Sequence, residues 1–226
     1  KAGVEAESGA TTMGLAFTSR SIPVLGNGTV LVNRVVVGDT NLDGVDDSHA
    51  DVSYGKDVDA DYRSPFSIAL GASHSWTDIT VHATAEYFIA IDPYTVMEAP
   101  AGESSPGVTS HPSEFQHALA EVFNWGVGIE KRFSEKTTAY ISFITDNSAS
   151  RPVSPYDITV STWDIYHLNG GVAFSLLGTD LTLGGGFAWG SEPLHLTPDS
   201  EGILPSTVNP SAVNYSRVKG ILGIAL

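Results

Sequence analysis

Residues 64–91 read SPFSIALGASHSWTDITVHATAEYFIAI, and this stretch decides the fold. Apolar or small side chains occupy every second position from Ile79 to Ile91. The positions beside and between them are polar: Asp78, Thr80, His82, Thr84 and Glu86. Because successive side chains of a β-strand point to opposite faces, this alternation predicts a strand with one apolar and one polar face. A similar strand begins at Phe66, and a short turn at 76–78 joins the two.

The same alternation recurs along the chain, at 123–130, 181–189 and, less cleanly, 218–226. Residues 1–7 form the first expected strand, and 11–38 and 48–76 are each expected to run as one long segment. A further segment, 157–176, is longer than a bilayer requires, so its strand is expected to project beyond the membrane. About nine strands follow from this pattern.

The connections between these strands are sorted by length. Those at 8–10, 76–78, 134–136 and 178–180 are short and polar, whereas those at about 39–64, 92–116, 147–156 and 191–213 are long and rich in Pro, Gly and acidic residues. Outer-membrane barrels have short periplasmic turns and long extracellular loops. The sequence therefore predicts an all-β protein, an antiparallel up-and-down transmembrane β-barrel formed by 1–226 as a single domain, in the bacterial outer membrane among lipid and lipopolysaccharide.

Composition agrees with this prediction and excludes other classes. Mean hydropathy is +0.03, as expected when only every second residue of a strand faces lipid. A net charge of −15 with 11 Lys and Arg argues against nucleic acid as a partner. With no Cys, the chain has neither disulfides nor thiolate ligands. A soluble β-sandwich binding module is the alternative, which the sorting of the loops disfavours.

The strand count also predicts how the barrel closes. If the short turns are periplasmic, the first expected strand and the last one, 214–226, both run toward the periplasm. A single-chain bacterial barrel with both ends there needs an even number of strands. We therefore expect at least one more strand before Lys1, which makes the chain the C-terminal part of a larger barrel.

Polar positions on the alternating strands are candidates for the lumen of this barrel. They are Thr80, His82, Thr84, Glu86, Asn124, Glu130 and Arg132. Aromatic residues near strand ends are expected to form the interfacial girdles of such barrels. These are Trp76, Tyr87, Trp125, Phe133, Tyr140, Trp163, Tyr166, Trp189 and Tyr215.

Two stretches resemble outer-membrane transporters of the FadL-like family. One is Ser64 to Ala72 with the short turn and the strand that follows, and the other is Gly14 to Ser19 with the Pro- and Gly-rich patch that contains Pro23, Gly26 and Gly28. The resemblance covers about the first 180 residues and rests on strand pattern. It implies a porin-like monomeric barrel that passes long-chain fatty acids or aromatic hydrocarbons and is gated by an N-terminal plug. The chain as given departs from the family in having no plug and in ending with Leu226, where such barrels usually end with an aromatic residue.

The acidic stretch that begins at Asp39 has the spacing of a calcium-binding loop. Side-chain oxygens of Asp39, Asn41 and Asp43, the carbonyl of Val45 and the carboxylate of Asp47 are the expected Ca²⁺ ligands, with Gly44 at the sharp turn. Ala50 stands where an EF-hand has its last Glu, so Asp46, Asp51 or water would complete the shell. The alternative is a plain hairpin turn, for which Asn, Asp and Gly are also the common residues.

Enzymatic motifs are absent from the sequence. His82 and Glu86 share a strand face, but four residues along a strand span about 13 Å, too far for a direct hydrogen bond. We therefore predict that the protein is not an enzyme but a channel that passes small hydrophobic molecules, such as fatty acids, by passive diffusion. The alternative is a structural or adhesive surface protein, whose Ca²⁺-ordered outer hairpin binds lipopolysaccharide or neighbouring surface proteins.

Overall fold

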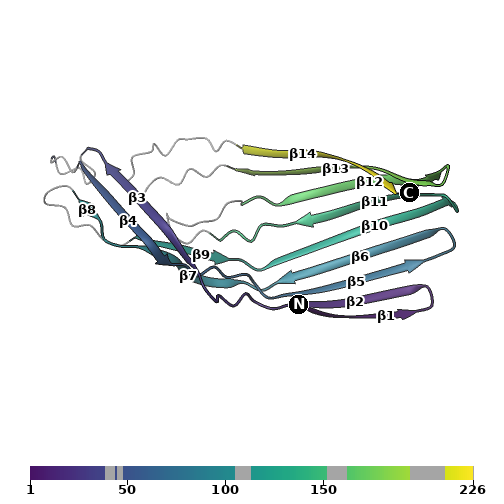
Figure 1. The fold of residues 1–226 in the computed structure, drawn as a ribbon, viewed down its shortest axis with the longest axis horizontal. Helices are drawn as coiled ribbons and strands as arrows, with labels where there is room; N and C mark the ends of the chain where they lie inside the picture. The colour runs from purple at the N-terminus through teal and green to yellow at the C-terminus, as the bar shows by residue number, and fades with distance from the viewer. Residues whose placement is uncertain (39–43, 45–47, 105–112, 152–161, 194–211, 226) are drawn as a thin grey trace.

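The computed structural model describes residues 1–38, 44, 48–104, 113–151, 162–193 and 212–225. Nine strands form one antiparallel sheet in the order β1-β2-β5-β6-β10-β11-β12-β13-β14 (Figure 1). Their bounds are β1 Ala2–Ser8, β2 Thr11–Thr18, β5 Ser67–Ser75, β6 Ile79–Phe88, β10 Val122–Ser134, β11 Thr137–Asp146, β12 Ile165–Leu176, β13 Thr179–Pro193 and β14 Ala212–Ala225. Sheet neighbours follow chain order, so the predicted all-β, antiparallel up-and-down arrangement of about nine strands is confirmed.

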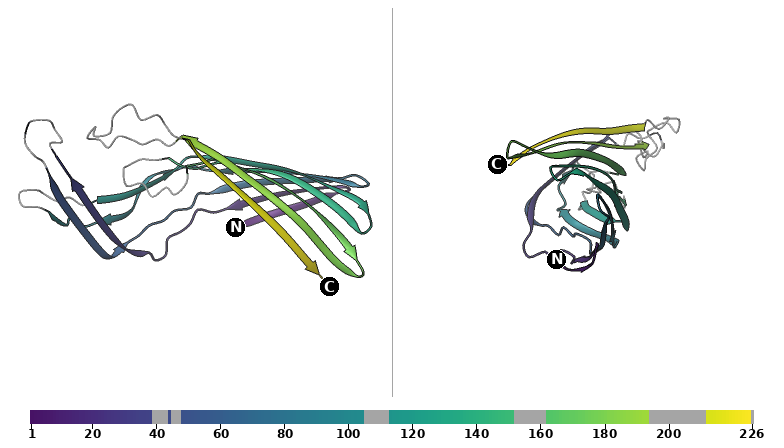
Figure 2. Two further views of the ribbon diagram at one scale, coloured as in Figure 1. Left: turned by 90° about the horizontal axis from the view of Figure 1, so that it is seen from above. Right: turned by 90° about the vertical axis from the view of Figure 1, so that its right-hand side faces the viewer.

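The sheet is strongly curved, and seen end-on it forms an open arc (Figure 2). Within the described part of the chain, β1 pairs only with β2 and β14 pairs only with β13, so these two strands are the edges of the arc. In the same part, no helix has the length and apolar character needed to cross a membrane.

Tight turns join the strands at one end of the sheet, which we call the turn end. Gly9 has φ of 60° in the β1–β2 turn, and Leu177 and Gly178 have φ of 54° and 84° in the β12–β13 turn. Two successive residues with positive φ match the right-handed twist of a hairpin, and glycine adopts them without strain. The predicted short connections are therefore present, with the last one centred at 177–178 instead of 178–180.

The long connections leave from the opposite, loop end, and those between β2 and β5 and between β6 and β10 contain further strands (Figure 1). A three-stranded sheet consists of β3 (Asn27–Val36), β4 (His49–Asp59) and β8 (Glu103–Ser104), and a hairpin pairs β7 (Ile91–Ala99) with β9 (Ser113–Leu119). The expectation that 11–38 and 48–76 each form one strand is wrong. Pro and Gly in 23–28 and Pro65 interrupt the ladders, because proline lacks the N–H that a ladder needs. Much of 39–64 and 92–116, expected as loops, is strand.

The outer strands have a small core of their own. Ile91, Tyr94 and Val96 are buried together, with Met97 and Leu119 packed against them. Burial raises the pKa of the Tyr94 hydroxyl. Apolar burial of this kind stabilises a hairpin that would be marginal alone in water.

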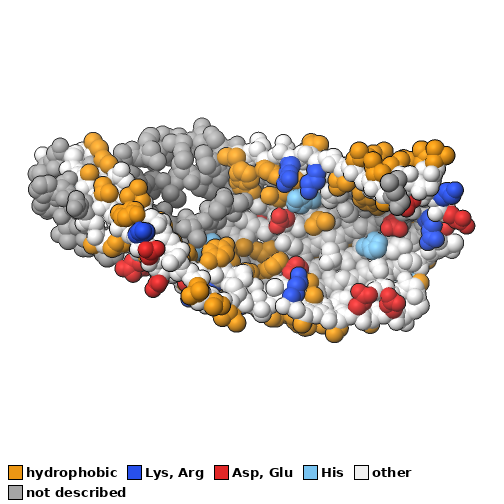
Figure 3. All heavy atoms as spheres, in the orientation of Figure 1, with side chains coloured by type: hydrophobic (Ala, Val, Ile, Leu, Met, Phe, Trp, Pro, Cys, Tyr) orange, Lys and Arg blue, Asp and Glu red, His pale blue; other side chains and the backbone are white. Residues whose placement is uncertain are grey.

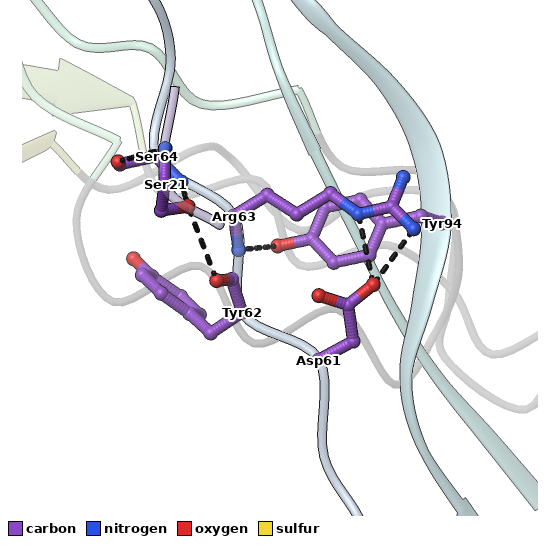
Figure 4. A network of polar contacts seen from close by, with 6 residues as sticks. All are labelled: Ser21, Asp61, Tyr62, Arg63, Ser64 and Tyr94. Atoms are coloured by element: carbon purple, nitrogen blue, oxygen red, sulfur yellow. Dashed lines mark hydrogen bonds and ion pairs between the residues drawn. The ribbon is translucent and has the colours of Figure 1, made fainter. Parts of the chain in front are cut away.

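A polar network attaches this outer part to the point where the chain returns to the main sheet (Figure 4). The backbone N–H of Arg63 donates to the Tyr94 hydroxyl at 2.9 Å, and its guanidinium bonds Asp61 at 2.7 Å and lies over the Tyr94 ring. The N–H of Ser64 donates to the Ser21 hydroxyl at 2.7 Å. Segments before β3 and after β4 are thereby held together at the loop end.

Candidate functional site

The register of the ladders separates the side chains of the main sheet into two faces. His82 lies opposite Ser73 and Gly128, and Thr84 lies opposite Gly71 and Gly126. These residues line the hollow of the arc, so we call theirs the concave face. Figure 3 looks onto this hollow, which is mostly white, while orange hydrophobic side chains gather along its rims and over the outer strands.

The other, convex face is apolar and exposed. Val218 is 82% exposed, Leu222 68% and Met13 59%. Aromatic rings cluster on it toward the loop end, with 5.5 Å between the centroids of Trp125 and Phe143 and 5.9 Å between those of Tyr166 and Trp189. The apolar side chains of the convex face and the polar side chains of the concave face come from the same strands. The two surfaces are therefore separated by the alternation of side chains along each strand.

Three adjoining cavities lie along the concave face, and Thr84 borders all of them. The largest, which we call the central groove, has a volume of about 570 Å³, and the one nearer the loop end has about 390 Å³. The third, of about 370 Å³, lies over β1, β2 and β5. A groove of about 570 Å³ falls in the usual range for small-molecule sites.

Glycines form much of the floor of the central groove. A Cβ built on Gly71 would meet no described heavy atom within 4 Å, and one on Gly14 would meet only the Val4 carbonyl at 3.9 Å. Both glycines lie on the concave face and line the groove. The absence of side chains at these two positions therefore leaves space in the groove.

Tyr140 lies against the wall of the same groove. A Cβ on Gly171 or Gly184 would come within 2.6 or 2.7 Å of the Tyr140 hydroxyl, so the phenol covers these two glycines. Tyr140 was expected in an interfacial girdle, and so was Tyr215, but the register places both on the concave face. For these two the girdle expectation is wrong, because nearness to a strand end does not determine the face.

The predicted lumen residues all fall on the concave face. Thr80 lies opposite Glu130, and Glu86 lies opposite Asn124. His82, Thr84 and Glu130 line the central groove, and Thr84, Glu86 and Asn124 line the cavity nearer the loop end. Thr80 and Arg132 border neither cavity, and Arg132 lies toward the turn end.

Ionised groups on this face are mostly carboxylates. Glu86 accepts a hydrogen bond of 2.6 Å from Ser67, a buried residue at the loop end. Asp146 lies 3.9 Å from the His167 imidazole in the cavity nearer the loop end. Glu5, on the edge strand β1, borders the central groove. Sequence reasoning missed Glu5, Tyr140, Asp146 and His167, because their faces follow from the register between neighbouring strands and not from local alternation.

The candidate calcium ligands Asp39, Asn41, Asp43, Val45 and Asp47 lie outside the described residues. Gly44 is described and has φ of 89°, the left-handed conformation that a sharp turn requires. Within the described residues, no group of three or more His, Cys, Asp or Glu side chains is placed to hold a metal ion.

No protein-family model and no curated protein sequence matches the chain. Among solved structures, it is similar to a protein described as "CymD monoaromatic hydrocarbon channel", with a TM-score of 0.48 and 10% sequence identity. The match covers 95% of this chain and 47% of that one, so the chain spans about half the length of the structure it matches. What this chain does has to follow from its own residues.

Proposed function

We propose that the protein is an outer-membrane β-barrel channel, through which small hydrophobic molecules diffuse passively along the concave face. The observation that carries the proposal is the separation of the two faces of one sheet. A contiguous exposed apolar surface is unfavourable in water and favourable against lipid. A face of small and polar side chains with adjoining cavities is what a lumen requires.

The hydrogen bonding of the backbone also supports a position of the main sheet in the membrane. Lipid offers no hydrogen-bond partners, so a sheet spans a bilayer only when its strands are paired with one another. The nine strands of the main sheet pair with their neighbours over nearly their full lengths, with a register shift between Arg132 and Ser134. The convex face then contacts lipid, and the outer strands at the loop end lie on the extracellular side near lipopolysaccharide.

The proposed cargo is a class of small hydrophobic molecules, and the sequence resemblance extends it to fatty acids and aromatic hydrocarbons. Passive transport needs a path with contacts weak enough to release the cargo. The wall of the central groove supplies such contacts, because it combines glycine and small side chains with Tyr140 and isolated polar groups.

The test is uptake of labelled benzyl alcohol by porin-deficient bacterial cells with and without the full-length protein. The proposal expects faster uptake when the protein is present and folded in the outer membrane. Folding is followed in parallel by gel migration in SDS with and without boiling, since folded barrels usually resist SDS until heated. Equal uptake by cells that contain the folded barrel would refute the proposal.

We also propose, from the spacing of its oxygen ligands, that the loop from Asp39 to Asp47 binds Ca²⁺. The positive φ of Gly44 supports it, because that position of a calcium loop needs a sharp turn. The role would be structural. Bound Ca²⁺ would reduce repulsion between the carboxylates at the tip of the β3–β4 hairpin.

A further inference from the structure

We propose that the central groove selects its cargo by charge, and favours hydrophobic cations over hydrophobic anions. The inference rests on the proposed channel function and narrows its cargo. Tyr140 is the first observation that carries it. The phenol is held against the wall over Gly171 and Gly184 and borders the groove, so its ring is a fixed aromatic surface for cargo. Aromatic faces attract organic cations.

The second observation is the position of Glu130 on the neighbouring strand. Glu130 is the direct cross-strand partner of Tyr140, and both residues border the groove. Directly opposed residues in an antiparallel pair have Cβ atoms about 5 Å apart, so one cargo molecule can contact both. The ring extends from Tyr140 over Gly171 and Gly184, on the side away from Glu130. A hydrophobic cation on the ring is therefore attracted by the ring and, at the edge of the ring, by Glu130, whereas a carboxylate or sulfonate would be repelled by Glu130.

The third observation is the distribution of charge over the whole concave face. Four carboxylates border the three cavities, and they belong to Glu5, Glu86, Glu130 and Asp146. Of the described residues that border these cavities, none is Lys or Arg. Among the described Asp, Glu, Lys and Arg side chains, those that border the path are therefore all carboxylates.

Positive charge on this face lies away from the groove. Arg132 is two residues from Glu130 along β10, toward the turn end, where it offsets part of the charge of Glu130 without bordering the groove. By register, Arg217 and Lys219 of β14 are four strands from Glu130 and three from Tyr140, or about 19 Å and about 14 Å along the wall. Both separations exceed the Debye length of about 8 Å at physiological salt. A fatty-acid carboxylate is therefore poorly matched to the middle of this path.

The experiment is a competition in porin-deficient cells that carry the full-length protein. Uptake of labelled benzyl alcohol is measured against increasing benzyltrimethylammonium, which is permanently positive, or benzenesulfonate, which is permanently negative. We expect the cation to inhibit uptake at a concentration about tenfold lower than the anion, as one or two unscreened charges at close range predict. Glu5→Gln with Glu130→Gln should bring this ratio close to one, and Tyr140→Leu should weaken inhibition by the cation alone.

Glu135→Gln is the matched control, because it removes the same charge from the exposed β10–β11 turn, outside the lumen. It should leave the ratio unchanged, because Glu135 does not border the groove. Inhibition by the anion as strong as that by the cation, or a ratio that survives loss of Glu5 and Glu130, would overturn the inference. If benzyl alcohol uptake itself does not depend on the protein, the proposed function fails instead.

Discussion

Replacement of Gly71 by Phe should narrow the central groove without disturbing the fold. A Cβ at Gly71 meets no described atom within 4 Å and points into the groove. Gly71 has no positive φ, so a larger residue fits its backbone, and exchange of glycine for an aromatic residue in a strand is neutral or stabilising by up to about 1 kcal/mol. Gly71→Phe should therefore fold and insert like the wild type.

The magnitude follows from the size of the groove. A cavity of about 150 Å³ holds one benzene ring, so the new phenyl group occupies roughly a quarter of the groove's 570 Å³. An aromatic cargo that buries about 200 Å² would lose about 50 Å² of contact, which at about 25 cal/mol per Å² is ~1.2 kcal/mol. This corresponds to a fivefold to tenfold slower uptake, at about 1.4 kcal/mol for each factor of ten.

The assay is initial uptake of benzyl alcohol at equal amounts of folded, heat-modifiable protein. Gly220→Phe is the control, because Gly220 is equally open but lies on the convex face of β14. That variant should transport like the wild type. Uptake through folded Gly71→Phe at the wild-type rate would show that cargo does not pass this groove, and would refute the reasoning.

Three further predictions address the wall, the loop and the outer strands. Gly184→Ala should destabilise the protein by about 1–3 kcal/mol, because the new Cβ lies 2.7 Å from the Tyr140 hydroxyl and overpacks the wall. In denaturant unfolding, the same substitution should destabilise the Tyr140→Phe protein less, and an equal loss of stability in both proteins would contradict the prediction. Isothermal titration should show a Ca²⁺ site that weakens strongly on Asp43→Ala, and no heat with the wild type would reject the site. Because burial raises the pKa of Tyr94 from 10.0, the contribution of the neutral hydroxyl to the stability of the outer strands is complete below pH 10 and is lost as the pH rises through the raised value. Hydrogen exchange of β7 should therefore accelerate above pH 10 in the wild type and accelerate less in Tyr94→Phe.

The main sheet could be predicted because its signal is local. The residues on each side of Trp76 alternate without interruption, so the faces of β5 and β6 follow from the sequence alone. The predicted lumen residues of β6 and β10 fall on one face for the same reason. Tyr140 could not be assigned in this way, because a register shift between Arg132 and Ser134 precedes the turn at 135–136 and changes which residues of β11 face the hollow.

The outer strands could not be predicted in the same way, because their positions depend on contacts between distant segments. Gly26 and Ala60 are joined by a backbone hydrogen bond of 2.9 Å where the chain leaves and re-enters the main sheet. Composition suggested loops there, since acidic and turn-forming residues are common in both loops and exposed hairpins. Glu5 was missed because its strand is short and its importance depends on the cavity that β1 helps to form.

The most direct test of the account is cysteine scanning of adjacent positions, which is straightforward in a chain without native Cys. Single variants Ser73→Cys and Thr84→Cys place a thiol on the concave face, and Ala72→Cys and Ala83→Cys place one on the convex face at the same depth. In intact outer membranes, a membrane-impermeant thiol reagent should label the first pair and spare the second, because the thiolate reacts only where water reaches it. Labelling of all four positions, or of the second pair alone, would contradict a water-accessible concave lumen inside a lipid-facing barrel.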